Sequence, residues 1–586
     1  MSTHDEQSHS ESVEPVPVDT SGRISRRRFI TWGAGGAAAV ATALAIGEAV
    51  SGGTRSLTAA QARERTTRPT SGTTRHGETF TRLPDGVSLP TSTAIIAENA
   101  KTGHAWWVTT PQNAGDIEGY ASQTSAAAGD TVTLFVNTKA STFHVEAYRM
   151  GWYQGIGARL VWQSAEVPGA RQAFPALIRP TNTIECAWIP SLSITVDGNW
   201  PSGAYLLKLV GATGEQQFVP LCVRDDASRA AIVIQQGVTS WQAYNRWGGY
   251  SLYYGNRNGT YSFTHAPVGA TYSNRARIVS FDRPYDHDWA SGAADFVGNE
   301  FPVIFQAERL GLDVTYWTDV DLHSRPQLLP NHKALVSLAH DEYWSEPMRD
   351  GAGQALAGGV NLAFLGANAC YRQIRFEPSP LGPDRHQVCY KSAAEDPLRG
   401  HDDALVTVNW AQAPVSRPEA QLIGSTYQDI DAYADLVITD PSSWALGGTG
   451  LTLGQHLPKA VQGEFDRYVP NGAGPANVDV IAHSPVPNRH NYSDVTWYTV
   501  PGGGGVFATG NASWVGLLSD SSLVPPDVLP GPVPGITPAL LRIMQNVYSV
   551  IGSGPASLTH PSHGNWRAAY APGPARVVTP STGNAS

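Results

Sequence analysis

The residues of this sequence that are best suited to chemistry lie in short polar clusters, each of which follows an apolar run. One cluster contains His340, Asp341 and Tyr343, and another, at 366–372, contains Tyr371. A later apolar run leads in the same way to Asn511. Histidine, carboxylate and phenol groups transfer protons or bind metal ions, and an amide orients a polar ligand. These residue types therefore indicate a catalytic or metal-binding site, but they do not identify the reaction.

The elements that would position these clusters follow from an alternation of apolar runs and helical segments after residue 226. This alternation predicts an α/β domain over residues 228–555, with an open, mostly parallel sheet and helices on both faces. Loops that follow the strands of such a sheet lie on one edge, where ligands bind. We therefore expect Tyr343 and Tyr371 to emerge on the same edge. The predicted strands are 231–234, 312–316, 334–338 and 360–365, and the predicted helices are 301–310 and 346–357.

Each candidate residue also has an ordinary structural explanation. Asp341 precedes a helix that starts near Ser345, and acidic residues at that position favour the helix dipole. Tyr343 and Tyr371 can be partly buried aromatic residues whose hydroxyl groups find partners. Glu464 can be a solvated strand residue. Only the expected convergence of these residues on one edge favours a functional interpretation.

The N-terminal part of the sequence has a different pattern. Short alternating apolar runs with turn residues between them predict an antiparallel, immunoglobulin-like β-sandwich over residues 88–225. The connection at 224–228 is too short for a free linker, so we expect the sandwich to pack closely on the α/β domain. The remaining predicted segments are a twin-arginine-type signal region at 1–62, a polar linker at 63–87 and a disordered tail at 556–586.

Composition and charge narrow the class of protein. The chain has 586 residues, a formal net charge of −10 and only 15 % charged residues, which argues against non-specific binding to nucleic acid. Its 4 cysteines lack the spacing of a zinc site. Outside the cell they can pair, and Cys186 with Cys222 is the pairing that we expect first.

The segment around Arg26 and Arg27 predicts where the protein works. The paired arginines follow an acidic stretch and precede a short run at 33–46 that is rich in glycine and alanine. A later Ala60-Gln61-Ala62 sequence completes a pattern typical of twin-arginine export, in which the protein crosses the membrane already folded. We therefore expect an extracellular or cell-envelope protein whose only membrane contact is the signal segment. Folded export often accompanies a cofactor that is loaded in the cytoplasm, so it favours a metal.

Several motifs in the sequence, taken in their order, resemble one known family. They are YRMGWY at 148–153, WPSG at 200–203, QAYNRWGG at 242–249, FDRPY at 281–285, HDEYWS at 340–345 and GANA at 366–369. This order is similar to that of the N,N-dimethylformamidase large (beta) subunit-like C-terminal domain family, over roughly residues 90–555. The motifs are specific for the family but not for a substrate.

The resemblance implies a metal site. In dimethylformamidase, a domain similar to class I glutamine amidotransferases holds one iron through two tyrosines and one glutamate. By resemblance, Tyr343, Tyr371 and Glu464 are the expected ligands of a ferric ion (Fe3+). The enzyme has a histidine two residues before its glutamate, where this sequence has Gln462.

The same resemblance implies a hydrolase of a non-peptide C–N (amide) bond. Three protein ligands leave positions for water and an amide oxygen, so the metal would polarise the carbonyl and supply hydroxide. Asp341 or His340 would move the proton, and Asn511 would orient the substrate. A small-molecule amide is the expected substrate, with a small subunit or a second copy as a possible partner. A non-catalytic binding protein and a carbohydrate-handling surface protein on the same scaffold are the alternatives.

The signal interpretation makes a direct prediction. Replacing Arg26 and Arg27 by lysine should retain the protein in the cytoplasm, because arginine presents a planar fork of donors that lysine cannot copy. Cell fractionation of the wild type and the double variant checks this. Normal export of the lysine variant would show that the signal assignment is wrong.

Overall fold

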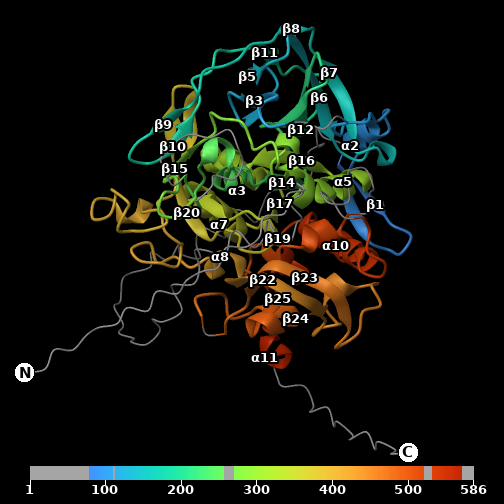
Figure 1. Ribbon diagram of the computed structural model, residues 1–586. Helices are drawn as coiled ribbons and strands as arrows, with labels where there is room; N and C mark the ends of the chain where they lie inside the picture. The colour runs from blue at the N-terminus through green and yellow to red at the C-terminus, as the bar shows by residue number, and fades with distance from the viewer. Residues whose placement is uncertain (1–77, 110–112, 257–269, 471, 520–530, 571–586) are drawn as a thin grey trace, which may run out of the picture.

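The computed structural model describes residues 78–109, 113–256, 270–470, 472–519 and 531–570. This part of the chain has mixed α/β structure with strands in several sheets (Figure 1). The expected signal region at 1–62 lies outside the described residues. Within them, no helix has both the length and the apolar character that crossing a membrane requires.

A sheet of seven strands in the order β16-β14-β17-β19-β26-β25-β24 forms the centre of the molecule. Neighbouring strands from β16 to β26 pair in parallel, whereas β25 pairs antiparallel with β26 and β24. The predicted parallel arrangement is therefore confirmed for the first five strands in this order. The strands are β14 (Ile232–Gln236), β16 (Val314–Thr318), β17 (Ala334–Ala339), β19 (Asn361–Gly366), β24 (Asp479–Val486), β25 (Asn491–Thr499) and β26 (Gly505–Ala508).

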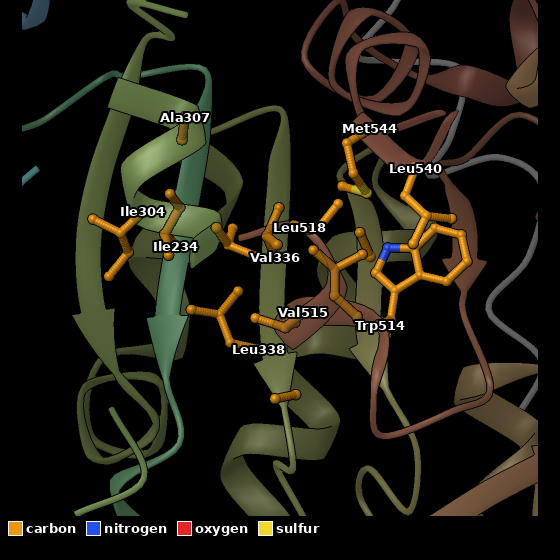
Figure 2. Close-up of a cluster of buried hydrophobic side chains, with 14 of the residues drawn as sticks. Ile234, Ile304, Ala307, Val336, Leu338, Trp514, Val515, Leu518, Leu540 and Met544 are labelled. Atoms are coloured by element: carbon orange, nitrogen blue, oxygen red, sulfur yellow. The ribbon is translucent and has the colours of Figure 1, made fainter. Parts of the chain in front are cut away.

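Helices cover both faces of this sheet, because its strands present apolar side chains in two directions. On one face, Ile234 of β14 joins a buried cluster with Ile304 of α5 and Leu540 of α10 (Figure 2). On the other face, the adjacent Val233 joins a cluster with Met348 of α7. Successive side chains of a strand point to opposite faces, so every residue of β14 is buried.

Two of the described helices, α6 and α7, begin at a capping side chain. Thr318 caps α6 by accepting a hydrogen bond from the backbone of Asp321, whose side chain accepts from the Thr318 backbone in return. The helices are α2 (Thr93–Asn99), α3 (Val238–Tyr244), α4 (Phe296–Asn299), α5 (Phe301–Arg309), α6 (Asp319–Ser324), α7 (Glu346–Ala357), α8 (Ala420–Ile423), α9 (Trp514–Leu517), α10 (Thr537–Ile551) and α11 (Trp566–Ala569). Short 3-10 turns are η2 (Tyr153–Gly155), η3 (Trp247–Gly249), η4 (Ala290–Gly292), η5 (Pro326–Asn331), η6 (Asp403–Leu405), η7 (Trp444–Leu446), η8 (Pro487–Arg489) and η9 (Ala556–Leu558).

Two further sheets contain most of the N-terminal strands. Their orders are β11-β5-β3 and β4-β13-β12-β6-β7, with β8 paired to β6. One buried cluster includes side chains of both sheets, among them Val136 of β5 and Leu207 of β12. An immunoglobulin-like sandwich stays a prediction. The strands are β3 (Ile117–Ala121), β4 (Ser125–Ala126), β5 (Thr131–Thr138), β6 (Thr142–Met150), β7 (Ala158–Gln163), β8 (Val167–Pro168), β11 (Leu192–Thr195), β12 (Gly203–Gly211) and β13 (Gln216–Val223).

The remaining strands form smaller sheets around the central one. The longest of them, β22 and β23, make an antiparallel pair that lies beside β24 and β25 of the central sheet (Figure 1). A four-stranded sheet has the order β15-β21-β20-β18. These strands are β1 (Glu78–Arg82), β2 (Ser88–Ser92), β9 (Ala176–Ile178), β10 (Thr183–Glu185), β15 (Ile278–Ser280), β18 (Tyr343–Ser345), β20 (Arg372–Ser379), β21 (Gly382–Val388), β22 (Thr426–Val437) and β23 (His456–Arg467).

Two predicted segment boundaries differ from the structure. Strand β1 lies inside the expected polar linker at 63–87, because it pairs along its whole length with β2. The expected disordered tail at 556–586 begins with ordered structure up to residue 570. Asp479 holds this part by accepting a hydrogen bond from the backbone of Gly564 at 2.8 Å, and Asn565 accepts one from the backbone of Val480 at 2.7 Å.

The expected pairing of Cys186 with Cys222 is wrong, because all four cysteines are free and buried. Cys186 packs in a cluster with Tyr120 and Trp188. Cys222 belongs instead to the large cluster beside the central sheet. The two thiols thus lie in different cores.

A buried ion pair joins the N-terminal sheets to the α/β part. Arg149 of β6 donates to both carboxylate oxygens of Glu308 on α5, at 2.8 and 2.6 Å, and both side chains are fully buried. Glu308 also accepts a hydrogen bond from the Tyr316 hydroxyl at 2.7 Å. The predicted close packing of these two parts of the chain is therefore confirmed.

Replacing Arg149 by methionine should lower the free energy of unfolding by about 3–5 kcal/mol, because it leaves the Glu308 charge buried without its partner. Urea unfolding followed by tryptophan fluorescence measures the change. The control is Lys139→Met, since Lys139 pairs with Asp116 but is half exposed, so its loss should cost less than about 1 kcal/mol. Equal losses for the two variants would contradict this assignment.

Candidate functional site

Two loops that follow neighbouring parallel strands meet at the carboxyl edge of the central sheet. His340 directly follows β17, and Tyr371 ends the loop after β19. The backbone N–H groups of Cys370 and Tyr371 donate to the carbonyls of Asp341 and Glu342, both at 2.9 Å. The structure thus brings the two predicted loops side by side.

The Glu342 carboxylate is the centre of a polar network at this edge. It is 1 % exposed. It accepts hydrogen bonds from the hydroxyls of Tyr244 at 2.7 Å and Tyr253 at 2.9 Å, and from Arg372 Nε at 3.3 Å. Burial by itself would raise the pKa of Glu342, but His340 and two basic side chains hold that pKa below its usual value. The carboxylate is therefore ionised.

His340 lies between two carboxylates. Its Nε2 is 2.9 Å from Oε2 of Glu464 and 3.4 Å from Oε2 of Glu342. Glu464 reaches this position on β23, which is attached to the sheet edge by a backbone hydrogen bond of 3.0 Å from Ala512 to the Glu464 carbonyl. Burial would lower the pKa of His340, but Glu464 and then Glu342 outweigh it and raise that pKa to about 10. His340 is therefore an imidazolium at neutral pH.

The three predicted metal ligands occupy different parts of this network. Tyr343 is fully buried, and its hydroxyl donates to the Tyr253 hydroxyl at 2.7 Å. The Tyr371 hydroxyl accepts from Asn409 Nδ2 at 2.7 Å. In the part of the chain that the structure describes, no hydrogen bond or ion pair directly joins Tyr343, Tyr371 and Glu464. Tyr343 and Glu464 are connected only through the intervening side chains.

These positions test whether the residues suit an iron ion. Glu464 Oε2 is a buried carboxylate oxygen that receives no hydrogen bond, although His340 is near it. Hard oxygen donors of this kind, together with the Tyr371 phenol, suit a ferric ion. The Tyr343 hydroxyl is instead committed to Tyr253. Among the described residues, no group of three or more His, Cys, Asp or Glu is placed to hold a metal. Glu464 and Tyr371 thus fit the group, whereas Tyr343 does not fit it in this conformation.

Besides His340, the two other residues predicted to assist catalysis, Asp341 and Asn511, are both buried. Asp341 accepts hydrogen bonds from Gln235 and from Ser337, each at 2.8 Å, and burial raises its pKa to about 6. The side-chain oxygen of Asn511 accepts from the Ser513 hydroxyl at 2.8 Å. The carboxylate of Asp341 and the amide oxygen of Asn511 therefore both accept hydrogen bonds within the protein.

Gln462, which stands where the dimethylformamidase glutamate has a neighbouring histidine, does not enter the network. Its amide donates to the carbonyl of Lys459 at 2.7 Å. The imidazole beside Glu464 is that of His340, which comes from the loop after β17.

Six residues of the network were missed by sequence reasoning. Glu342 and Tyr244 lie within the HDEYWS and QAYNRWGG motifs and Arg372 follows Tyr371 directly, so a signal existed for these three. The others come from irregular segments or from a hairpin with no motif, and nothing in the sequence marks them. They are Tyr253, Asn409 and Tyr427.

The accessible part of the site is a half-buried surface. The side chains of His340 and Glu464 are 18 % and 13 % exposed, although His340 Nε2 and Glu464 Oε2 themselves are buried. A cavity of about 30 Å³, the size of one water molecule, lies at the carboxyl ends of β14 and β16 and is lined by Gln236 and Thr318. A second cavity of about 200 Å³ lies between α5 and α10. Among the described residues, the predicted site residues line neither cavity.

Comparison with known proteins gives one family. The family described as N,N-dimethylformamidase beta subunit-like, C-terminal, matches residues 144–526. No curated protein matches the chain. A solved structure of a Paenibacillus sp. cycloisomaltooligosaccharide glucanotransferase, complexed with cycloisomaltoheptaose, is 9 % identical over 68 % of this chain and 69 % of that chain. Its TM-score of 0.15 is too low to support a shared fold.

The raised pKa of His340 predicts a specific dependence on pH. The interaction between His340 and Glu464 should stabilise the fold fully below about pH 6.5, the usual histidine value, and be lost as the pH rises through about 10. NMR titration of ¹⁵N-labelled histidine, assigned with a His340→Gln variant, measures the midpoint directly.

Two variants serve as test and control for this titration. Glu464→Gln should lower the His340 midpoint, whereas Glu166→Gln should not change it, because Glu166 contacts His144 instead. A midpoint near 6.5 in the wild type would show that the ion pair does not form.

Proposed function

The chain belongs to the N,N-dimethylformamidase beta subunit-like family, and on that basis we propose that it is an exported hydrolase of a non-peptide amide C–N bond. The observation that carries this proposal is the charged network at the sheet edge, where His340 lies within 3.4 Å of two carboxylates. Such an arrangement holds a proton close to a carboxylate that can accept another. Amide hydrolysis needs both functions, one for the attacking water and one for the departing amine.

We assign the base and the acid function to two different residues, Glu464 and His340. The Glu464 carboxylate accepts a proton from the attacking water, and the His340 imidazolium donates one to the departing nitrogen. In the metal-free site, burial raises the pKa of Tyr371 to about 12, so its hydroxyl is protonated and can donate to the substrate carbonyl oxygen. If Tyr371 binds iron instead, the same oxygen would be a deprotonated ligand. Arg372 holds the neighbouring Glu342 in place and keeps this side of the site rigid.

A metal is part of the proposal, because the dimethylformamidase family is generally metal-dependent. Iron bound by Tyr343, Tyr371 and Glu464 stays a prediction. When bound, such an ion polarises the carbonyl and acidifies water. Of the three proposed ligands, only Tyr343 has to exchange an existing hydrogen bond, the one to Tyr253, to take part.

The family description also bears on partners. It names a beta subunit, so the matched domain belongs to a class of chains that work as subunits. We propose a small-molecule amide as the substrate and a small subunit or a second copy of this chain as the partner. Nucleic acid is not among the proposed partners, in keeping with the net charge of −10.

A panel of small amides tests the proposal. The purified protein should release amine from at least one of them, and Glu464→Gln should lower kcat/KM by about 10²–10⁴-fold, because general acid–base groups contribute that much. The control is Glu166→Gln, which changes an exposed glutamate outside the site. Metal content should be measured for each variant, so that loss of iron is separated from loss of proton transfer. Full activity of Glu464→Gln, or no hydrolysis of any amide, would favour a non-catalytic scaffold.

A further inference from the structure

The cavity of about 30 Å³ lies where the N-terminal sheets meet the α/β part of the molecule. Gln123, in the loop between β3 and β4, lines it from the N-terminal side. Gln236 at the end of β14, Arg283 and Arg385 line it from the other side. Among the described residues, those of the network around Glu342 do not line it, so the cavity is separate from the candidate site.

Three side chains on this cavity carry polar atoms without a partner among the described residues. They are Nε2 of Gln123 and Oε1 of Gln236, which are both buried, and one nitrogen of Arg385. Arg385 is 5 % exposed and donates through Nε to Asp282 at 2.7 Å and through NH2 to two backbone carbonyls, which leaves NH1 uncommitted. Buried polar groups are nearly always hydrogen-bonded, so this convergence of unpaired atoms indicates a bound water molecule or ion.

The charges around the cavity favour an anion over a water molecule. Arg283 is 1 % exposed, and its N–H groups donate to Gln242 Oε1 and to backbone carbonyls. Burial lowers the pKa of Arg283 to about 10, so the side chain is still a cation at neutral pH.

The two arginines share a single carboxylate. Asp282 forms an ion pair with Arg385, and among the described residues no carboxylate pairs with Arg283. One buried positive charge is therefore left without a counter-ion, which is costly in a protein interior. An anion in the cavity would remove this cost, whereas water would not.

The size of the cavity and its donors restrict the kind of anion. A volume of about 30 Å³ equals the share of one water molecule in the liquid, so phosphate, sulfate and carboxylates are too large. A single-atom anion fits, and it accepts hydrogen bonds from several directions. Arg385 NH1 and Gln123 Nε2 supply two donors. The Gln236 amide supplies a third when it turns its nitrogen inward, because the two ends of an amide have the same shape.

We propose that this cavity is a halide-binding site, in which Arg385 and the amides of Gln123 and Gln236 hold a chloride ion that neutralises Arg283. The ion would contact the N-terminal sheets and the α/β part at once, so it would stabilise their packing. Arg149 and Glu308 join the same two parts through a buried ion pair. The inference does not depend on the amide-hydrolase function, because it concerns a separate cavity.

Thermal unfolding of the full-length protein tests the proposal. Chloride replaces gluconate at constant ionic strength, and tryptophan fluorescence gives the midpoint temperature. A ligand that binds only the folded state raises the midpoint with the logarithm of its concentration. A chain of this length should gain about 1 °C for each tenfold increase in chloride above the dissociation constant.

Two variants of one side chain separate chloride binding from a general salt effect. Gln123→Glu places a carboxylate beside Arg385, so its midpoint should be the same with and without chloride and no lower than that of the wild type in gluconate. Gln123→Leu removes a donor and supplies no charge, so it should lose most of the chloride response. The matched control is Gln545→Glu on α10, which lines the other cavity and should respond to chloride like the wild type.

Crystals grown with bromide give a readout that does not depend on stability. Anomalous density for one bromide ion should appear within hydrogen-bonding distance of Arg385 NH1 and Gln123, and it should be absent in Gln123→Glu. A wild-type midpoint that ignores chloride, or an equal chloride response in Gln123→Glu, would overturn the proposal and assign the cavity to water. Bromide in the crystal without a chloride response in solution would indicate an adventitious ion only and would overturn it as well.

Discussion

A buried negative charge at Glu342 is the constraint on which the site depends. A carboxylate that is 1 % exposed is stable only if other groups neutralise it and donate to it. Here Tyr244, Tyr253 and Arg372 come from three other segments, and His340 comes from the same loop as Glu342. One charge thus fixes the relative positions of α3, the segment after it, the start of β20 and the loop after β17. The orientation of His340, and through it that of Glu464, therefore depends on the Glu342 carboxylate.

The fold supplies the convergence that this centre requires. Parallel pairing of β17 and β19 places the loops of His340 and Tyr371 side by side. The β22–β23 hairpin then crosses the same edge, where a bridge between Phe465 and Asn511 fixes Glu464 opposite His340. A second buried pair, Arg149 with Glu308, joins the N-terminal sheets to the α/β part. Buried ion pairs therefore fix the positions of the N-terminal sheets and of the β22–β23 hairpin relative to the central sheet.

The sequence predicted the elements better than the directions of the side chains. Apolar runs such as Ile232–Gln236 are visible because both of their faces are buried, and the edge argument placed His340 beside the Tyr371 loop correctly. It also placed Tyr343 on the same edge as Tyr371, because β18 pairs with β20, but it did not predict that the Tyr343 ring lies in a buried cluster. Asn409 lies in an irregular segment, so only the folded chain shows what it contacts. The order of the motifs predicted the family correctly, but the motifs do not predict the orientation of a side chain such as the Tyr343 hydroxyl.

Hydrogen exchange in a Glu342→Gln variant tests the organising role of this charge most directly. Glutamine keeps the shape but cannot neutralise Arg372 and His340, so amide exchange should accelerate in peptides covering 240–254, 340–344, 370–375 and 406–412. Peptides from the N-terminal sheets, such as 131–150, should exchange as in the wild type. Unchanged exchange in the four site segments, or equal acceleration across the whole chain, would contradict the claim that Glu342 holds the site together.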